Sequence, residues 1–491
     1  MRGRIRAGSV WSVVVLALLA GGLVALAQGP SGEALVWLAG GTPVDPVGPG
    51  TLAWVMAGED TPDLLVNVPD EGLSTRFFPC GAEPFAASGE YFVAYVGGQR
   101  GDLYRVPLQE RTIDSLVRWG DASALACNGV GRAVFSPNGQ RWAYLDYPAG
   151  VVSLPYPAGE MRVLDADSGE AIASFADVVA FAWHEDGLYF VRFFANAQGR
   201  ADEAAMFWWP GQGEALERAT IIPTEECTWR VASLDAQPDT GEVALSFGEL
   251  CTGGSRWRLY TATPQGVVSE HVYMAAGGAY FSDAYINQVY YLADGRILAT
   301  YPNGRARNLA NLVWVSPAAN AITRIANEVI VDTYPGGSAM HVRRSADGSA
   351  LAFVTVTANQ DYAVHRLALT GDPTLLTFSA GRRDDLISTL FFTPGGDLAY
   401  VAGGADGADN ALWLLPADAS EPLLVRRGRY LRDVGLGAEG VALLLEHVPA
   451  DTGYLSTAAN LVAVTLEENG AQTVLVAGRD ARAWASPLSW R

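Results

Sequence analysis

The stretch Phe135-Ser136-Pro137-Asn138-Gly139-Gln140-Arg141-Trp142-Ala143-Tyr144 contains the pattern that decides the fold of this chain. Pro137 fixes the backbone torsion φ at the start of a turn, and Asn138-Gly139 tolerates the left-handed backbone of a tight turn. The residues after the turn follow the period of a strand that packs one face inward. The stretch therefore predicts a β-hairpin.

The same phrase recurs along the chain at intervals of about 50 residues. Related copies lie at 85–95, 344–353 and 392–400, and degenerate copies lie at 183–187 and 234–238. Most copies are followed by a further strand, a second turn and an outer strand, so one unit has about four strands. A repeat of about this length is typical of β-propeller blades.

A single unit of this kind cannot bury both of its faces, so the units are expected to stack around an axis. We predict an all-β fold, a β-propeller of four-stranded antiparallel blades, with about eight blades favoured and about seven to nine allowed. Residues 483–490 resemble the start of another repeat at the end of the chain. The N-terminal strands expected at 51–57 and 63–68 would complete that blade and leave no open sheet edge.

The hairpin at 135–139 and its copies resemble the WD40-like repeats of TolB-type β-propellers, a family that is also similar to the propeller domains of prolyl oligopeptidases. The resemblance covers most of residues 85–430 and implies the propeller fold. Several copies lack the aromatic residue or the Pro-Asp/Asn-Gly turn, and no peptidase domain is recognisable beside them. The resemblance therefore implies a fold and identifies no catalytic residue.

The first residues have the composition of an export signal. Arg2, Arg4 and Arg6 precede an uncharged run at 7–27, which ends in the small-x-small pattern of a signal peptidase site. We expect a signal peptide at 1–27, a linker and entry segment at 28–50, and a single propeller domain at 51–491. The alternative is an uncleaved membrane anchor, since the run has about the length that spans a bilayer. Either way, we expect a periplasmic or extracellular protein.

The charge balance excludes several classes of function. The chain has 53 acidic and 33 basic residues, a formal net charge of -20, and every basic residue is Arg. Without Lys there is no Walker lysine, Schiff-base lysine or Ser-x-x-Lys pair. A nucleic-acid partner is also disfavoured, because phosphate binding needs a basic face. We expect a monomer without a cofactor, in contact with a membrane only through an uncleaved N-terminal segment.

The four cysteines favour disulfides in an exported chain. A turn-forming stretch at 237–241 lies near the midpoint between Cys227 and Cys251, so two strands that fold back there would bring these sulfurs together. The remaining pair, Cys80 and Cys127, each precede an apolar strand of similar pattern. We predict the pairs Cys227–Cys251 and Cys80–Cys127; a metal site is disfavoured because no Cys-x-x-Cys spacing exists.

Candidate residues for chemistry are few. No Ser has Gly on both sides, and the five His show no metal-binding spacing. His184 and Asp186 lie at a hairpin turn and are candidates for ligand binding at an axial opening. Trp208 and Trp209 belong to aromatic clusters that flank the loop at 195–205, where strand packing is the alternative. The weak calcium candidates Asp406 and Asp409 lie in an acidic loop that lacks the full calcium-loop pattern.

These observations favour a binding or interaction module that recognises an envelope or extracellular protein or a cell-wall component. The first alternative is a propeller-type hydrolase or lyase whose carboxylates, such as Asp186, Asp347 or Asp397, converge at the central axis. The second alternative is a structural accessory of a membrane complex. The sequence identifies no catalytic residue for any of them.

Overall fold

A computed structural model provides the structure of the chain. It describes strand segments between residues 33 and 135 and at 484–490 by their backbone, and most of residues 136–477 with side chains, apart from 147–157, 276–287, 303–308, 331–341, 357–361, 371–373, 382–388, 403–409, 429–434, 437–439, 448–458 and the single positions 167, 186, 225, 320, 346 and 394. Among the described residues, no helix has the length and apolar character needed to cross a membrane.

The strands of the first half of the chain are β1 (Glu33–Gly41), β2 (Pro46–Met56), β3 (Asp63–Val68), β4 (Thr75–Pro79), β5 (Glu90–Gly97), β6 (Arg100–Pro107), β7 (Asp114–Trp119), β8 (Val134–Phe135), β9 (Arg141–Asp146), β10 (Gly159–Asp165), β11 (Ala171–His184), β12 (Gly187–Ala195), β13 (Ala201–Trp209), β14 (Leu216–Ile221), β15 (Cys227–Ala236), β16 (Val243–Cys251), β17 (Gly254–Ala262) and β18 (Val268–Ala275).

The second half comprises β19 (Val289–Tyr291), β20 (Ile297–Pro302), β21 (Leu309–Ser316), the short 3₁₀ helix η3 (Pro317–Ala319), β22 (Ala321–Ile330), β23 (Val342–Arg344), β24 (Ala350–Val356), β25 (Tyr362–Ala368), β26 (Leu375–Gly381), β27 (Thr389–Phe392), β28 (Leu398–Ala402), β29 (Asn410–Leu415), β30 (Leu423–Gly428), β31 (Gly435–Leu436), β32 (Val441–His447), β33 (Ala459–Thr465), β34 (Gln472–Val476) and β35 (Trp484–Trp490). The predicted all-β antiparallel class is confirmed.

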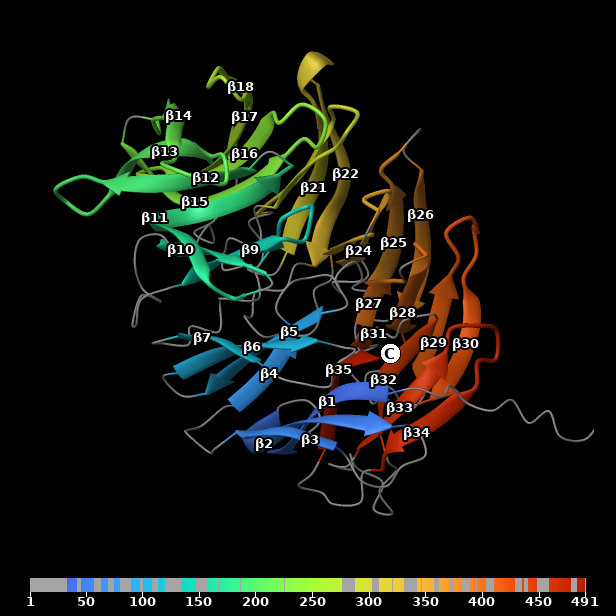
Figure 1. Cartoon of the computed structure of the whole chain (residues 1–491). Helices are drawn as coiled ribbons and strands as arrows, with labels where there is room; N and C mark the ends of the chain where they lie inside the picture. Colours follow the sequence, from blue (N-terminus) through green and yellow to red (C-terminus); the bar gives the residue numbers. More distant parts are fainter. Residues whose placement is uncertain are drawn as a thin grey trace, which may run out of the picture.

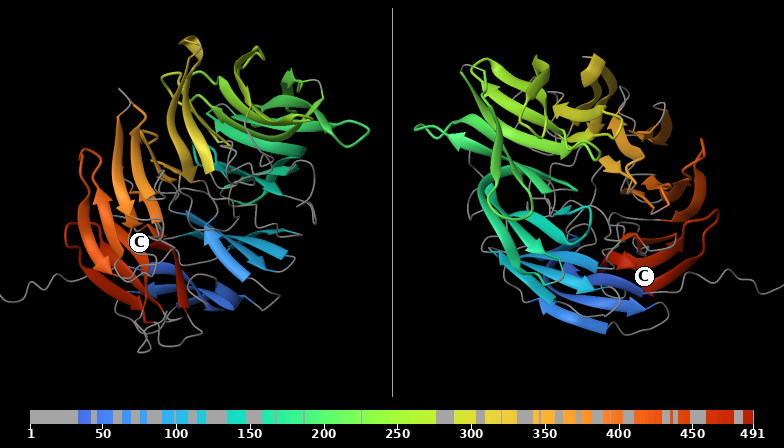
Figure 2. Two further views of the ribbon diagram at one scale, coloured as in Figure 1. Left: turned by 180° about the vertical axis from the view of Figure 1, so that it is seen from behind. Right: turned by 45° about the horizontal axis from the view of Figure 1, so that its top comes forward.

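The strands form antiparallel sheets that follow one another around a common centre (Figures 1 and 2). Five sheets have four strands each, and two larger sheets each divide into two four-stranded meanders. The first division falls within β11, which pairs with β10 through its first half and with β12 through its second half. The second division falls between β22 and β24, which share the pair Val329↔Thr355.

Counted in this way, the described strands make nine meanders, which lies within the predicted range of seven to nine, whereas the favoured number of eight is not confirmed. One boundary between meanders falls inside β11, a strand of 14 residues that runs from one meander into the next. Asp177 lies near the middle of this strand with a φ of 60°, beside a register shift between Val178 and Ala180. The strand passes there from one meander to the next without a turn sequence, and the hairpin copy at 183–187 is the first turn of the second meander.

The sheet at the chain ends has the strand order β3-β2-β1-β35. β35 pairs antiparallel with β1, from Ala34↔Trp490 to Ala39↔Trp484. The expected pairing of N- and C-terminal strands in one sheet is therefore present. The segment 28–50, which we expected to be a linker and entry segment, contains β1 and the start of β2, so the sheet includes residues earlier than predicted.

The hairpin that decides the fold has the predicted geometry. The amide of Ser136 donates to the carbonyl oxygen of Arg141 at 2.8 Å, and Gly139 has a φ of 70°. The side chain of Asn138 accepts hydrogen bonds from the Ser136 hydroxyl and the Gln140 amide. The copy at Ser345 repeats this arrangement with Asp347 in place of asparagine.

The core consists of separate apolar clusters, each built by two neighbouring meanders. Val243 and Leu245 of β16 pack toward the β11–β14 meander, whereas Ala244 between them packs toward β19–β21. Likewise, Phe353 of β24 joins the cluster with β19–β22, whereas Ala352 joins the cluster with β27–β29. Because successive side chains of a strand point to opposite faces, each of these meanders is buried on both sides.

Arginine side chains add a polar contact at three consecutive joints. Arg296 donates to the carbonyl oxygen of Leu369 at 3.1 Å, Arg366 to that of Ala417 at 2.6 Å, and Arg426 to that of Gly470 at 3.1 Å. Each acceptor lies in the turn between the third and outer strands of the following meander. The guanidinium groups therefore connect each of these meanders to the turn before the outer strand of the next meander.

We expect Phe247→Ala to lower the free energy of unfolding by about 3–5 kcal/mol, because it opens a cavity at a joint between meanders. Phe247 is fully buried and contacts the rings of Phe193, Trp229 and Tyr260. Urea unfolding followed by tryptophan fluorescence measures the effect. Val267→Ala, at a side chain that is 63% exposed, is the control and should change little; equal effects of the two substitutions would contradict the joint as a source of stability.

We expect the stability of the protein to fall as the pH drops from about 6.5 toward 4, because of His365. Burial lowers the pKa of His365 to about 4, and its ring contacts the hydroxyls of Thr355 and Thr377. The unfolded chain binds this proton more readily than the folded chain does. The contribution of neutral His365 to stability is therefore complete above the unfolded pKa and is lost as the pH falls through this window. The loss is on the order of 2–3 kcal/mol.

Chemical unfolding of the wild type and of His365→Gln across this pH range measures the contribution. The variant should have a flatter pH profile than the wild type. Identical slopes would show that another group controls the pH dependence.

Candidate functional site

His184 ends β11 and lies against the neighbouring meander. Its Nε2 atom is 3.0 Å from the carbonyl oxygen of Pro238, in the turn between β15 and β16. The imidazole lies edge-on to Trp208, with ring centroids 6.3 Å apart. His184 therefore bridges two meanders. Asp186, the other candidate in this turn, lies outside the described residues.

The two candidate tryptophans differ in exposure. Trp208 is half-buried, and its ring lies 4.3 Å from that of Tyr189 and so close to Gly187 that a Cβ atom there would clash. Trp209 is 2% exposed and donates from Nε1 to the carbonyl oxygen of Gly213. Trp209 therefore serves the core, in agreement with the packing alternative, whereas Trp208 presents part of its ring to solvent.

The hairpin of β12 and β13 extends beyond the neighbouring sheets (Figures 1 and 2). In the half of the hairpin nearer its turn, the guanidinium of Arg192 lies over the rings of Phe194 and Phe207, at 5.4 and 5.5 Å from their centroids. Its Nη2 atom is 3.5 Å from the carboxylate of Asp177. These residues form a mixed aromatic and charged face on β11–β13.

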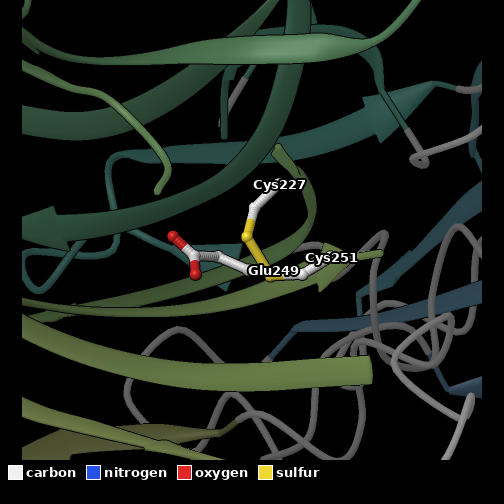
Figure 3. A group of neighbouring side chains, drawn as sticks. All are labelled: Cys227, Glu249 and Cys251. Carbon is white, nitrogen blue, oxygen red and sulfur yellow. A yellow bond between two sulfur atoms is a disulfide. The ribbon is translucent and has the colours of Figure 1, made fainter. Parts of the chain in front are cut away.

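The predicted Cys227–Cys251 disulfide is confirmed and joins directly paired residues of β15 and β16 (Figure 3). The two sulfurs and the carboxylate of Glu249 lie within 4.8 Å of one another. Because the sulfurs are bonded to each other, they do not offer the thiolates that zinc requires. Cys80, Cys127 and the calcium candidates Asp406 and Asp409 lie outside the described residues, so these predictions stay untested.

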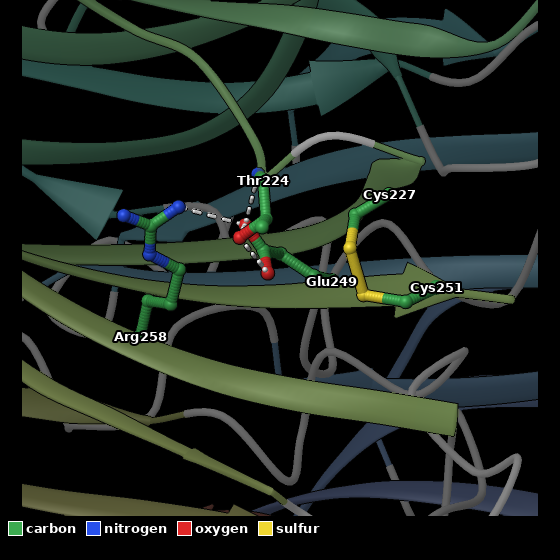
Figure 4. The surroundings of a disulfide bond; sticks show 5 residues. All are labelled: Thr224, Cys227, Glu249, Cys251 and Arg258. Carbon is green, nitrogen blue, oxygen red and sulfur yellow. Dashed lines mark hydrogen bonds and ion pairs between the residues drawn. A yellow bond between two sulfur atoms is a disulfide. The ribbon is translucent and has the colours of Figure 1, made fainter. Parts of the chain in front are cut away.

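A buried ion-pair network lies beside this disulfide (Figure 4). Glu249 is fully buried and accepts hydrogen bonds from the backbone amide of Thr224 at 3.0 Å and from Nη1 of Arg258 at 2.8 Å. Arg258 also makes two hydrogen bonds of 2.9 Å to Glu270. Burial alone would lower the pKa of Arg258, but the hydrogen bonds to Glu270 and Glu249 outweigh it and raise this pKa.

No local sequence signal marks this network, because the strand register of β16, β17 and β18 brings its members together. Trp229 and Tyr260 stack against the Arg258 guanidinium at 5.8 and 5.0 Å. The arrangement provides hydrogen-bond and ion-pair partners for both the Glu249 carboxylate and the Arg258 guanidinium. The network joins the side chains of β16, β17 and β18, and so stabilises the outer part of the β15–β18 meander.

We expect Arg258→Leu to lower the free energy of unfolding by about 3–5 kcal/mol, because it leaves the Glu249 carboxylate buried without its cation. Adding Glu249→Gln should recover a large part of this loss. Urea unfolding of both single variants and the double variant measures the coupling. Additive losses would contradict direct pairing of the two side chains.

The carboxylates considered for an axial enzyme site have local roles in turns. Asp347 accepts hydrogen bonds from the Ser345 hydroxyl and the Ser349 amide, and the Ser345 contact is the main cause that lowers the pKa of Asp347. Asp397 accepts a hydrogen bond from the amide of Ala417 at 2.8 Å. Each of these contacts stays within one meander, where it shapes a turn.

The outer strands share a feature that sequence reasoning did not identify. Four exposed aliphatic residues, one per meander, each pair with the penultimate residue of the preceding strand: Leu216 with Trp208, Ile322 with Val315, Leu375 with Leu367, and Leu423 with Leu414. We call these four residues the outer rim. Ile172 and Val267 are also exposed near the starts of outer strands, and Val474 is exposed at the middle of β34.

The outer rim is one repeated surface by topology. The first-to-second and third-to-fourth turns of an antiparallel four-stranded meander lie at the same end. Each rim residue therefore lies at that end, on the last strand, which is the strand farthest from the common centre of the sheets (Figure 1). The signal in the sequence was an aliphatic residue soon after each third-strand turn, but its exposure depends on which strand is outermost.

Comparison with known proteins gives no family. No family model matches the chain, and no curated protein matches it. Similar solved structures include a prolyl endopeptidase (14% identity, 79% of this chain and 55% of that chain, TM-score 0.44), a eukaryotic initiation factor (11%, 92% and 98%, 0.49) and TolB from Acinetobacter baumannii (13%, 77% and 72%, 0.31). The chain thus spans about half the length of the prolyl endopeptidase. These identities and TM-scores are too low to assign an activity.

Proposed function

We propose that this chain is an exported β-propeller that acts as a binding module for an envelope or extracellular protein, using its outer rim. The single observation that carries the proposal is the repeated exposure of Leu216, Ile322, Leu375 and Leu423 at one register position. Isolated exposed aliphatic residues are ordinary, but their repetition at one register position on four meanders departs from a random scatter and supports a contact there. Burial of such side chains favours association with a protein surface.

The propeller architecture is part of the proposal. The meanders are its blades, and the pairing of β35 with β1 supports closure of the ring in a blade that contains both chain ends. The confirmed Cys227–Cys251 disulfide is compatible with export, since disulfides persist in oxidising compartments. A signal peptide at 1–27 and monomeric assembly belong to the same proposal.

A cell-wall component is the other ligand class in this proposal. The half-exposed Trp208 and the Arg192 face on the β12–β13 hairpin suit contacts with sugar rings, because aromatic faces stack on apolar sugar surfaces. An axial hydrolase or lyase and a membrane-complex accessory remain alternatives. The turn-forming contacts of Asp347 and Asp397 do not favour the first of them.

We expect a variant with Leu216→Ser, Ile322→Ser, Leu375→Ser and Leu423→Ser to capture at least about tenfold less partner, because each serine removes apolar area from the contact. The measurement is in-cell cross-linking of the tagged protein in the envelope fraction, with captured proteins and glycans identified by mass spectrometry. Ile222→Ser, at a 66% exposed residue beyond the opposite end of β14, is the control.

Capture that is equal in the rim variant and the Ile222 control would overturn the rim as the binding surface. Robust turnover of a purified substrate by the protein would favour the enzyme alternative.

A further inference from the structure

Two adjacent meanders, β27–β30 and β31–β34, present exposed aliphatic side chains close to exposed carboxylates. Leu423 is 39% exposed at the start of the outer strand β30, and Val474 is 46% exposed at the middle of the outer strand β34. The turns that lead into these strands carry four exposed acidic residues: Asp418, Glu421, Glu467 and Glu468. We call these six residues the acidic rim patch.

Backbone contacts hold the two halves of the acidic rim patch together. The amide of Gly470, in the turn before β34, donates to the carbonyl oxygen of Val425 at 2.9 Å, and the amide of Asn469 donates to that of Leu424 at 3.4 Å. Arg426 donates to the carbonyl oxygen of Gly470. The carboxylate-bearing turn of one meander therefore lies directly against the outer strand of the other.

The packing beneath this joint fixes its geometry. A Cβ atom added to Gly470 would lie 2.0 Å from the carbonyl oxygen of Thr465, so the turn passes too close for any side chain. Val425 is fully buried in the cluster that both meanders share. The aliphatic and acidic groups of the patch are thus presented on a preorganised surface, which reduces the entropy lost on binding.

The charge of the patch determines the kind of partner that fits it. The guanidinium of Arg426 donates to the carbonyl oxygen of Gly470, and the exposed Arg427 lies toward the other end of β30, where it is paired with Ala411. The whole chain has a formal net charge of -20, so a second copy of this acidic chain would be repelled. A cationic segment would be attracted both by the carboxylates of the patch and by the long-range field of the negatively charged chain.

We propose that the acidic rim patch binds a cationic, amphipathic polypeptide segment of a partner protein, with its aliphatic side chains against Leu423 and Val474 and its basic groups beside the carboxylates. This inference rests on the proposed function and names the partner class for one part of the outer rim. The affinity falls with added salt, because exposed ion pairs are screened within about 10 Å at 0.1 M.

The test uses the full chain and a fluorescein-labelled amphipathic peptide of Lys and Leu, with a Glu and Leu peptide of the same pattern as the opposite-charge probe. Fluorescence anisotropy gives each dissociation constant at low and at physiological salt. The charge variant combines Asp418→Asn, Glu421→Gln, Glu467→Gln and Glu468→Gln. Its matched control removes four exposed charges elsewhere: Glu185→Gln, Asp202→Asn, Glu226→Gln and Asp239→Asn.

The inference predicts that the Lys and Leu peptide binds the native chain, that the charge variant weakens this binding by about tenfold or more, and that the control weakens it by less than about threefold. Leu423→Ser with Val474→Ser should also weaken it, whereas Ile222→Ser should not. Far-ultraviolet circular dichroism confirms that each variant is folded.

Three results would overturn the inference: no binding of the Lys and Leu peptide, equal binding of the Glu and Leu peptide, or equal losses in the charge variant and its control. The proposed function is judged separately by partner capture in the envelope. If capture still requires Leu216, Ile322, Leu375 and Leu423 while peptide binding fails, the partner is not cationic and the rim remains the binding surface.

Discussion

Burial of both faces of each four-stranded meander is the constraint on which the described core depends. A twisted four-stranded sheet exposes an apolar face on each side, and here adjacent residues such as Val243 and Ala244 join different clusters. Neither cluster forms without its two neighbouring meanders. The interaction that defines the fold is therefore apolar contact between meanders, and the hairpin turns only set the strands in register.

Arginine makes several of the polar contacts between meanders, in a chain that contains no lysine. Arg296, Arg366 and Arg426 each reach a carbonyl oxygen in the next meander. A guanidinium keeps its charge when partly buried and carries several donors in a fixed plane, so it satisfies such carbonyls while its stem packs on apolar surface. The network of Arg258 with Glu249 and Glu270 applies the same property within one meander.

Features set by short stretches of sequence could be predicted, whereas features set by register could not. The turn at Ser136 and the Cys227–Cys251 disulfide depend on residues within one hairpin, and both are confirmed. The pairing of Glu249 with Arg258 depends on the alignment of β16 with β17, which no local motif encodes. The passage of β11 from one meander to the next likewise has no turn sequence that announces it.

The same double-sided burial limits where this protein can bind another molecule. Side chains on both faces of the central strands are buried in the contacts between meanders, as the complete burial of Trp209, Phe247 and Trp257 shows. A binding residue must then lie on a turn, on an extended hairpin or at the start of an outer strand, where the meanders diverge. Leu216, Ile322, Leu375 and Leu423 occupy that last position. Selection for stability at the joints does not require aliphatic residues there, so their repetition favours a contact outside the chain.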